Sequence, residues 1–220
     1  MKGMPYTIVR SNRKSIALVI DSEANLVVRA PQSAKDNDIA DFVEKKERWI
    51  AEKQHHVAIF GEKHSPVVVE SGESLLYLGN TYTILKDAVP AIQTSSTNIL
   101  VPKEYGKKDV IDWLKDEAEK VLTERVSRYA SLMGVTYALV KLSGAKARWG
   151  SCSTRNNLNF AWRLIMCPMP VIDYVVVHEL SHIAYKNHST GFWARVKTVL
   201  PNYREQQDWL KVNRKLMEII

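Results

Sequence analysis

The amino-acid sequence predicts an α+β fold, with a β-rich N-terminal part that carries one helix and a mixed C-terminal part. Short β-branched runs separated by turn residues fill much of the first hundred positions. After Pro102 the composition shifts to Lys, Glu, Asp and Ala with an apolar stripe of helical period. The 220 residues, 45% of them hydrophobic, suffice for one sizeable domain or two small ones. We expect two domains, residues 1–102 and 103–220.

The N-terminal part is expected to combine an antiparallel meander with a helix and a hairpin. Ser33 offers an N-cap for a helix that continues on an apolar pattern to about Gln54. Gly79-Asn80 is a two-residue turn of the kind that matches strand twist, and it predicts a hairpin over residues 74–85. The other strands are expected at residues 6–9, 15–20, 26–30 and 99–101.

The C-terminal part is expected to begin with a long amphipathic helix that ends near Gly134. Turn residues around Gly144 and over 150–157 then bound two strand-like segments. The strands are expected at about 137–143 and 158–165, and three further helices at about 170–186, 190–200 and 205–218.

Composition argues against a membrane or secreted protein. No apolar run approaches the roughly 18–20 residues that a transmembrane helix needs, and the first residues contain no apolar signal segment. Two cysteines, Cys152 and Cys167, are too few for a disulfide framework and lack the C-x-x-C spacing of structural zinc sites. We expect a cytoplasmic protein with reduced thiols and no membrane partner.

The charge balance favours an acidic partner without identifying one. Lys and Arg number 31 against 24 Asp and Glu, a formal charge of +7. The segment 137–172 carries five of these cations and no acidic residue, which makes nucleic acid a candidate partner if the five share a face. They are Lys141, Lys146, Arg148, Arg155 and Arg163.

The motif His178-Glu179-Leu180-Ser181-His182 has the spacing of a metal site on a helix. A helix turns about 100° per residue, so His178 and His182 lie about 40° apart and about 6 Å along the axis. Two imidazoles can thus converge on one ion, while Glu179 stands beside them as a base. The alternative, three ordinary histidines near a packed helix, leaves unexplained why an apolar helix would desolvate them.

His188 is a third ligand only if the helix ends before it, since a continuous helix would turn it about 240° away. Asn187 in a left-handed conformation could end the helix, and Ser189 could cap the next one. Three imidazoles then leave one open position, the arrangement of a catalytic zinc site with one ion per chain.

These segments resemble the YgjP-like zinc metallopeptidases, which are distantly similar to SprT-like peptidases. The resemblance rests on residues 148–152 (RWGSC), Asn159 with 162–164 (WRL), 175–193 (VVVHELSHIAYKNHSTGFW) and, more loosely, 27–31, 49–50 and 78–79. It implies a zincin-like C-terminal domain with a small sheet and an HExxH helix. It also implies that His178, His182 and His188 bind zinc and that Glu179 is the catalytic base. Tyr185 stands where metzincins have Gly, which disfavours that group.

The chemistry expected of such a site is hydrolysis of peptide bonds by a zinc-activated water, with Glu179 as general base. We expect an edge strand to hold a protein or peptide substrate, with residues 159–163 as the candidate. Asn159, Trp162 and Arg148 are candidate substrate contacts, against core packing for Trp162 and a surface or ion-pair role for Arg148. Cys152 is more readily explained as an inert thiol than as a ligand.

A second functional class stays open. The protein could be associated with nucleic acid through segment 137–172, with a zinc site that acts only on DNA-bound proteins or is structural. A steep salt dependence of DNA affinity would distinguish this class from a simple peptidase.

Overall fold

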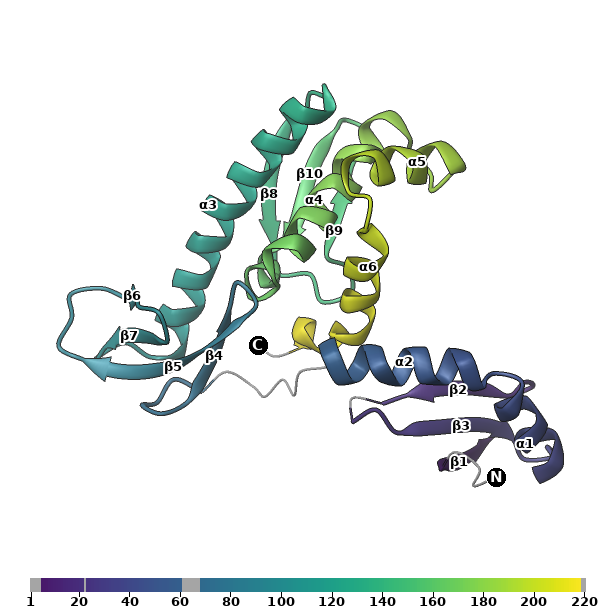
Figure 1. The fold of residues 1–220 in the computed structure, drawn as a ribbon. Helices are drawn as coiled ribbons and strands as arrows, with labels where there is room; N and C mark the ends of the chain where they lie inside the picture. The colour runs from purple at the N-terminus through teal and green to yellow at the C-terminus, as the bar shows by residue number, and fades with distance from the viewer. Residues whose placement is uncertain (1–4, 22, 61–67, 219–220) are drawn as a thin grey trace. The chain divides into compact units, whose positions relative to one another are not determined.

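The computed structural model describes residues 5–21, 23–60 and 68–218 (Figure 1). Contacts divide the chain into two compact units: the first unit is residues 1–63 with 211–213, and the second unit is residues 64–210 with 214–220. The expected boundary after residue 102 falls inside the second unit. As a statement about independently folding domains it stays a prediction.

The first unit packs a three-stranded sheet against helices. Its strands are β1 (Tyr6–Ser11), β2 (Ala17–Ile20) and β3 (Leu26–Pro31). The strand order is β1-β3-β2, with β1 parallel and β2 antiparallel to β3. The expected antiparallel meander is therefore wrong. The short β-branched runs predicted the strands, but such runs carry no information on which strand is the neighbour of which.

The helical stretch of the first unit is divided into α1 (Asp36–Glu44) and α2 (Glu47–Phe60). Lys35, rather than Ser33, occupies the N-cap of α1 and makes no side-chain cap. The break falls between Glu44 and Glu47, where the sequence has no Gly or Pro to mark it. The core contains Leu26, Val28, Ala30, Ile39, Val43 and Ile50.

The second unit begins with a four-stranded sheet of order β4-β5-β7-β6. Its strands are β4 (Ser74–Tyr77), β5 (Asn80–Asp87), β6 (Gln93–Thr94) and β7 (Asn98–Pro102). The predicted hairpin is present, but Tyr77 pairs with Asn80 and the turn is Leu78-Gly79, both at positive φ. A Cβ at Gly79 would lie 2.6 Å from Cα of Pro168, so only glycine allows this close approach.

The long predicted helix is confirmed as α3 (Lys107–Met133), and Gly134 ends it in the left-handed conformation. A three-stranded sheet of order β8-β10-β9 follows, comprising β8 (Leu139–Ser143), β9 (Gly150–Cys152) and β10 (Asn157–Ala161). Strand β9 lies where a turn was expected. Residues Trp162–Met166 form a buried 3-10 helix, η1, and do not prolong β10.

The chain ends with α4 (Met169–Ala184), α5 (Thr190–Val199), α6 (Tyr203–Val212) and the 3-10 helix η2 (Arg214–Glu218). Helix α4 packs against β9 and α3 (Figure 1). Arg125 of α3 forms a bidentate ion pair with Asp173 of α4, and the Tyr129 hydroxyl donates to the same carboxylate at 3.0 Å. The α+β class is confirmed. No helix in the described part of the chain has the length and apolarity to span a membrane.

Candidate metal centre

Three histidines converge at the end of α4. His178 and His182 lie one turn apart on the helix, and His188 follows in the five-residue connection to α5. One ligand nitrogen of each lies within 4.8 Å of the others, and the Nε2 atoms of His178 and His188 are 3.0 Å apart. The structure thus brings together the three residues that the spacing predicted.

The connection to α5 ends the helix differently from expectation. Helix α4 ends at Ala184 and Tyr185 follows in an extended conformation, whereas Asn187 is not in the left-handed region. Ser189 caps α5 as predicted, because its side-chain oxygen accepts from the Phe192 amide at 3.4 Å. The extended Tyr185 turns the chain away from the helix axis, which allows His188 to return to the first two histidines.

The hydrogen bonds of the histidines leave nitrogens free for an ion. Nδ1 of His182 lies 2.9 Å from the Tyr185 carbonyl oxygen, which can only accept, so Nδ1 carries the proton and Nε2 has the lone pair. Nδ1 of His178 lies 3.5 Å from the Tyr174 hydroxyl, and its Nε2 faces His188. Nitrogens on a tetrahedral zinc lie roughly 3.3 Å apart, given Zn–N bonds of about 2.0–2.1 Å. The donor set therefore fits a divalent metal of the zinc type.

Burial disfavours the charged form of the two imidazoles on α4, His178 and His182. Desolvation lowers the pKa of His178 to about 3, and the neighbouring His182 and His188 act in the same direction. Desolvation also lowers the pKa of His182. Neutral imidazole is the form that binds a metal, so burial favours the ligand form of His178 and His182.

Glu179 lies next to the histidines on the buried side of α4 and is 5% exposed. Burial raises the pKa of its carboxyl to about 8, and the charge of Arg148 opposes this shift. Gly150 of β9 makes room for this side chain, since a Cβ there would lie 2.7 Å from Oε1 and 2.8 Å from Cγ of Glu179. A carboxyl whose pKa lies within about one unit of neutral pH can both take up and release a proton.

One exposed cation lies near each end of β9. Arg148 precedes the strand and is close enough to act on the Glu179 charge. Lys186 donates from Nζ to the Asn156 side chain at 2.8 Å in the turn after the strand. Cys152, at the end of β9, lies outside the histidine group, and burial raises the pKa of its thiol. These contacts favour the inert-thiol interpretation of Cys152.

Strand β10 is central in its sheet, so the expectation that residues 159–163 form the edge strand is wrong. Among the described strands, β9 has a neighbour on one side only, and it is the strand that packs on α4. Asn159 pairs with Ser151, one position from the Phe160–Gly150 pair, so its side chain points to the sheet face away from Glu179. Its Oδ1 is buried without a hydrogen-bond partner.

Trp162 and Arg163 lie in the core. Trp162 is 4% exposed, and the Arg163 guanidinium stacks over its ring at 4.7 Å. The burial of Trp162 agrees with core packing, the alternative to substrate contact. Its contact with substrate stays a prediction. Arg163 is itself 4% exposed, so the five cations of segment 137–172 do not share one exposed face. No contact in the described residues favours nucleic acid as a partner.

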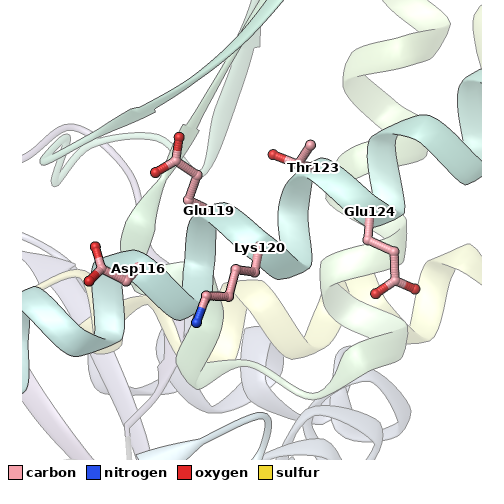
Figure 2. A pocket seen from close by; sticks show the side chains of 5 residues that line it. All are labelled: Asp116, Glu119, Lys120, Thr123 and Glu124. Atoms are coloured by element: carbon pink, nitrogen blue, oxygen red, sulfur yellow. The ribbon is translucent and has the colours of Figure 1, made fainter. Parts of the chain in front are cut away.

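A separate surface hollow lies on α3, lined by Asp116, Glu119, Lys120, Thr123 and Glu124 (Figure 2). All five side chains come from one exposed face of a single helix, as Figure 2 shows. Lys120 is paired with Glu117 at 2.8 Å. The hollow is therefore best explained as a solvated helix face with ordinary i,i+3 ion pairing. The three histidines remain the candidate metal centre.

The sequence-based prediction assigned no role to three residues around the site: Gly150, Tyr174 and Lys186. Tyr174 precedes His178 by one helical turn, so the helical period alone could have placed it beside that ligand. Gly150 and Lys186 stand within the motifs of the family resemblance, but their roles depend on contacts between segments distant in sequence, which the motifs do not show.

Two solved structures show partial similarity to this chain. The metallopeptidase zymogen abylysin of Pyrococcus abyssi is 19% identical with a TM-score of 0.36, over 40% of this chain and 87% of that one. The zymogen jannalysin of Methanocaldococcus jannaschii is 18% identical with a TM-score of 0.38, over 43% of this chain and 96% of that one.

A comparison with curated proteins gives no significant match. A family model, the YgjP-like metallopeptidase domain, matches residues 14–213, which is most of the chain. The match spans both compact units and includes the three histidines, Glu179 and Gly150. The chain belongs to the YgjP-like metallopeptidase family.

Proposed function

We propose that this protein is a zinc-dependent peptidase in which His178, His182 and His188 bind one zinc ion and Glu179 is the general base. The observation that carries the proposal is the placement of a buried carboxyl beside three imidazoles whose ligand nitrogens lie within 4.8 Å of one another. A carboxyl and the histidines of a packed helix are costly to desolvate alone, and together they form a site for a cation and a proton acceptor.

When bound, the ion would supply a Lewis acid that polarises the scissile carbonyl and makes water a better nucleophile at neutral pH. Glu179 accepts the proton of the attacking water, because burial raises the pKa of its carboxyl and makes the carboxylate a stronger base than it is in water. The same carboxyl then donates that proton to the amine nitrogen that leaves. Apolar neighbours such as Val175, Val176 and Leu180 exclude bulk water from this side of α4.

We infer that the peptide substrate lies along the free edge of β9. Main-chain hydrogen bonds to Gly150–Cys152 would hold an extended chain beside the histidines, as in strand addition to other sheet edges. Arg148 is the proposed substrate contact that this geometry supports best, because it is exposed and close to Glu179. Trp162 and Asn159 are weaker proposals, being buried or directed to the other face.

The decisive test is Glu179→Gln, assayed with a fluorogenic peptide library on protein loaded with zinc. The amide has nearly the same shape but cannot accept a proton, so we expect at least about a hundredfold lower kcat/KM with the fold unchanged. Zinc content, measured by elemental analysis, should stay at one equivalent per chain. Glu119→Gln, on the exposed face of α3, is the matched control and should retain wild-type activity.

Two results would contradict the proposal. Hydrolysis by Glu179→Gln at the wild-type rate would remove Glu179 as the base. A wild-type protein that retains less than about a tenth of an equivalent of any transition metal after reconstitution would remove the metal site itself.

A further inference from the structure

His188 differs from the other two ligands in how its ring is held. His178 and His182 stand on a buried helix, whereas His188 is exposed and belongs to the connection between α4 and α5. An exposed loop side chain samples several rotamers unless its neighbours restrict it. A third ligand in this position therefore needs contacts that fix the direction of its ring.

The start of α5 supplies those contacts. Ser189 is the N-cap, so His188 is the residue before the cap and Trp193 is the fourth residue of the helix. Apolar side chains at these two positions commonly pack together and set the angle at which the chain enters the helix. Here the His188 and Trp193 rings stack, with centroids 5.6 Å apart and planes inclined by 23°.

The stack continues away from His188 through two tyrosines. Trp193 stacks on Tyr203 of α6 at 5.3 Å, and Tyr203 stacks on Tyr174 of α4 at 6.3 Å, both with interplanar angles of 16°. Tyr174 and Tyr203 are 5% and 8% exposed, so neither ring can turn freely. The Tyr174 hydroxyl lies 3.5 Å from Nδ1 of His178. The aromatic column thus begins at one ligand and returns to another.

Phe192 contacts the same ligands from a different direction. Its fully buried ring lies 4.9, 4.6 and 4.8 Å from the rings of His178, His182 and His188. Phe192 therefore limits how closely the three imidazoles approach the core. Its ring meets the His188 ring edge-on, with an interplanar angle of 78°, whereas Trp193 is the described residue that stacks on the face of that ring.

We propose that Trp193, backed by Tyr203, is a positioning residue that holds His188 in the orientation of a metal ligand. Trp193 contacts no reacting atom in this arrangement. It acts through His188, on which it stacks, while its contact with the His178 ring is an edge contact at 5.8 Å to a ligand that the helix already holds. The inference rests on the proposed metal site. It adds to that site the residues that hold His188, the one proposed ligand that does not lie on α4. Outer contacts of this kind commonly change metal affinity by about 10–100-fold.

The test measures zinc affinity by chelator competition on purified full-length protein. We expect Trp193→Leu to weaken zinc binding by about 10–100-fold, and Trp193→Phe, which keeps an aromatic face, to restore most of the loss. Trp113→Leu is the matched control, because Trp113 packs on Tyr77 at 5.1 Å in the same unit and, among the described residues, makes no ring contact with a histidine. It should leave zinc affinity unchanged.

A double-mutant comparison separates positioning from general destabilisation. In a His188→Ala background there is no third ligand to orient, so adding Trp193→Leu should change zinc affinity by less than about twofold. Wild-type affinity in Trp193→Leu, or the same fold loss with and without His188, would overturn the inference.

Two further outcomes are distinguishable. A wild-type protein that binds no zinc would overturn the proposed function itself, whatever the variants do. If circular dichroism shows that Trp193→Leu is unfolded, Tyr203→Leu replaces it, with a smaller loss expected in the same direction and none in the His188→Ala background. Unchanged zinc affinity in a folded Tyr203→Leu would then count against the aromatic column.

Discussion

At the scale of single residues, Glu179 is a carboxyl whose surroundings differ strongly from water. Its pKa is raised from the ordinary 4.5 to about 8, with burial as the main cause and Arg148 as the opposing one. A carboxyl with a raised pKa in the folded state keeps its proton longer than the unfolded chain does. The contribution of Glu179 to the free energy of unfolding is therefore fully present below about pH 4.5. It is lost as the pH rises through about 8.

The raised pKa of Glu179 predicts how the stability of the metal-free protein depends on pH. The free energy of unfolding of the wild type, minus that of Glu179→Gln, should fall by up to about 1.4 kcal/mol per pH unit between roughly pH 4.5 and 8. Urea unfolding at pH 5, 6, 7 and 8 measures the difference, and the titrating histidines cancel because both proteins contain them. Glu119→Gln should show no such slope. A flat difference for Glu179 would mean that its carboxyl ionises as in water.

The same scale shows what the sequence could predict about the site. The i,i+4 spacing of His178 and His182 follows from helix geometry, and Ser189 is a recognisable N-cap, so both were predictable. The role of Gly150 was not, because a glycine in a short polar stretch reads as a turn. Only the position of the Glu179 carboxyl beside β9 shows why a side chain is excluded there.

At the scale of elements, α4 is fixed at its beginning and along its side. The turn Leu78-Gly79 contacts Pro168 just before the helix, and the Leu78 amide donates to the Ile165 carbonyl at 2.7 Å. One turn into the helix, Asp173 accepts two hydrogen bonds from Arg125, both at 2.6 Å, with each side chain about a tenth exposed. These contacts hold the helix that carries His178, Glu179 and His182.

Removing the carboxylate of the Arg125–Asp173 pair should lower the free energy of unfolding strongly. Asp173→Asn leaves the Arg125 guanidinium buried without its counter-charge, and we expect a loss of about 3–5 kcal/mol in the free energy of unfolding. The double variant Arg125→Met with Asp173→Asn should lose less than the sum of the single changes, since no unpaired charge remains. Asp112→Asn, which breaks exposed pairs on the same α3, is the control and should change stability little. Additive losses would show that the two side chains do not act as a pair.

Element types were more predictable than their pairing. The apolar stripe and Gly134 predicted α3 to within a few residues of its observed bounds, because a long helix repeats its signal many times. Strand neighbours depend on contacts distant in sequence, so the parallel β1–β3 pair and the central place of β10 were missed. The column of Tyr174, Trp193 and Tyr203 was beyond prediction for the same reason, since its rings come from three different helices.

At the scale of the whole molecule, every proposed metal ligand belongs to the second unit, and the first unit has a core of its own around Val28 and Ile39. An ion that binds only the folded state stabilises it by about 2.7 kcal/mol at a free concentration of 100 times Kd. That free energy acts on the cooperative unit that contains the ligands. The effect of zinc on each unit therefore reports whether the two units unfold together or separately.

We expect zinc to protect the second unit alone, as measured by hydrogen exchange with mass spectrometry on metal-free and zinc-loaded protein. Peptides from α4 and α5 should exchange more slowly with zinc, because opening either helix separates His182 or Trp193 from the site. Peptides from β1 and β3 should exchange at the same rate in both states. His182→Ala is the control, since it lacks one ligand and should lose most of the zinc-dependent protection. Equal slowing in β1 and α4 would show instead that the two units unfold as one cooperative body, and that the ion bound at the histidines stabilises the entire chain.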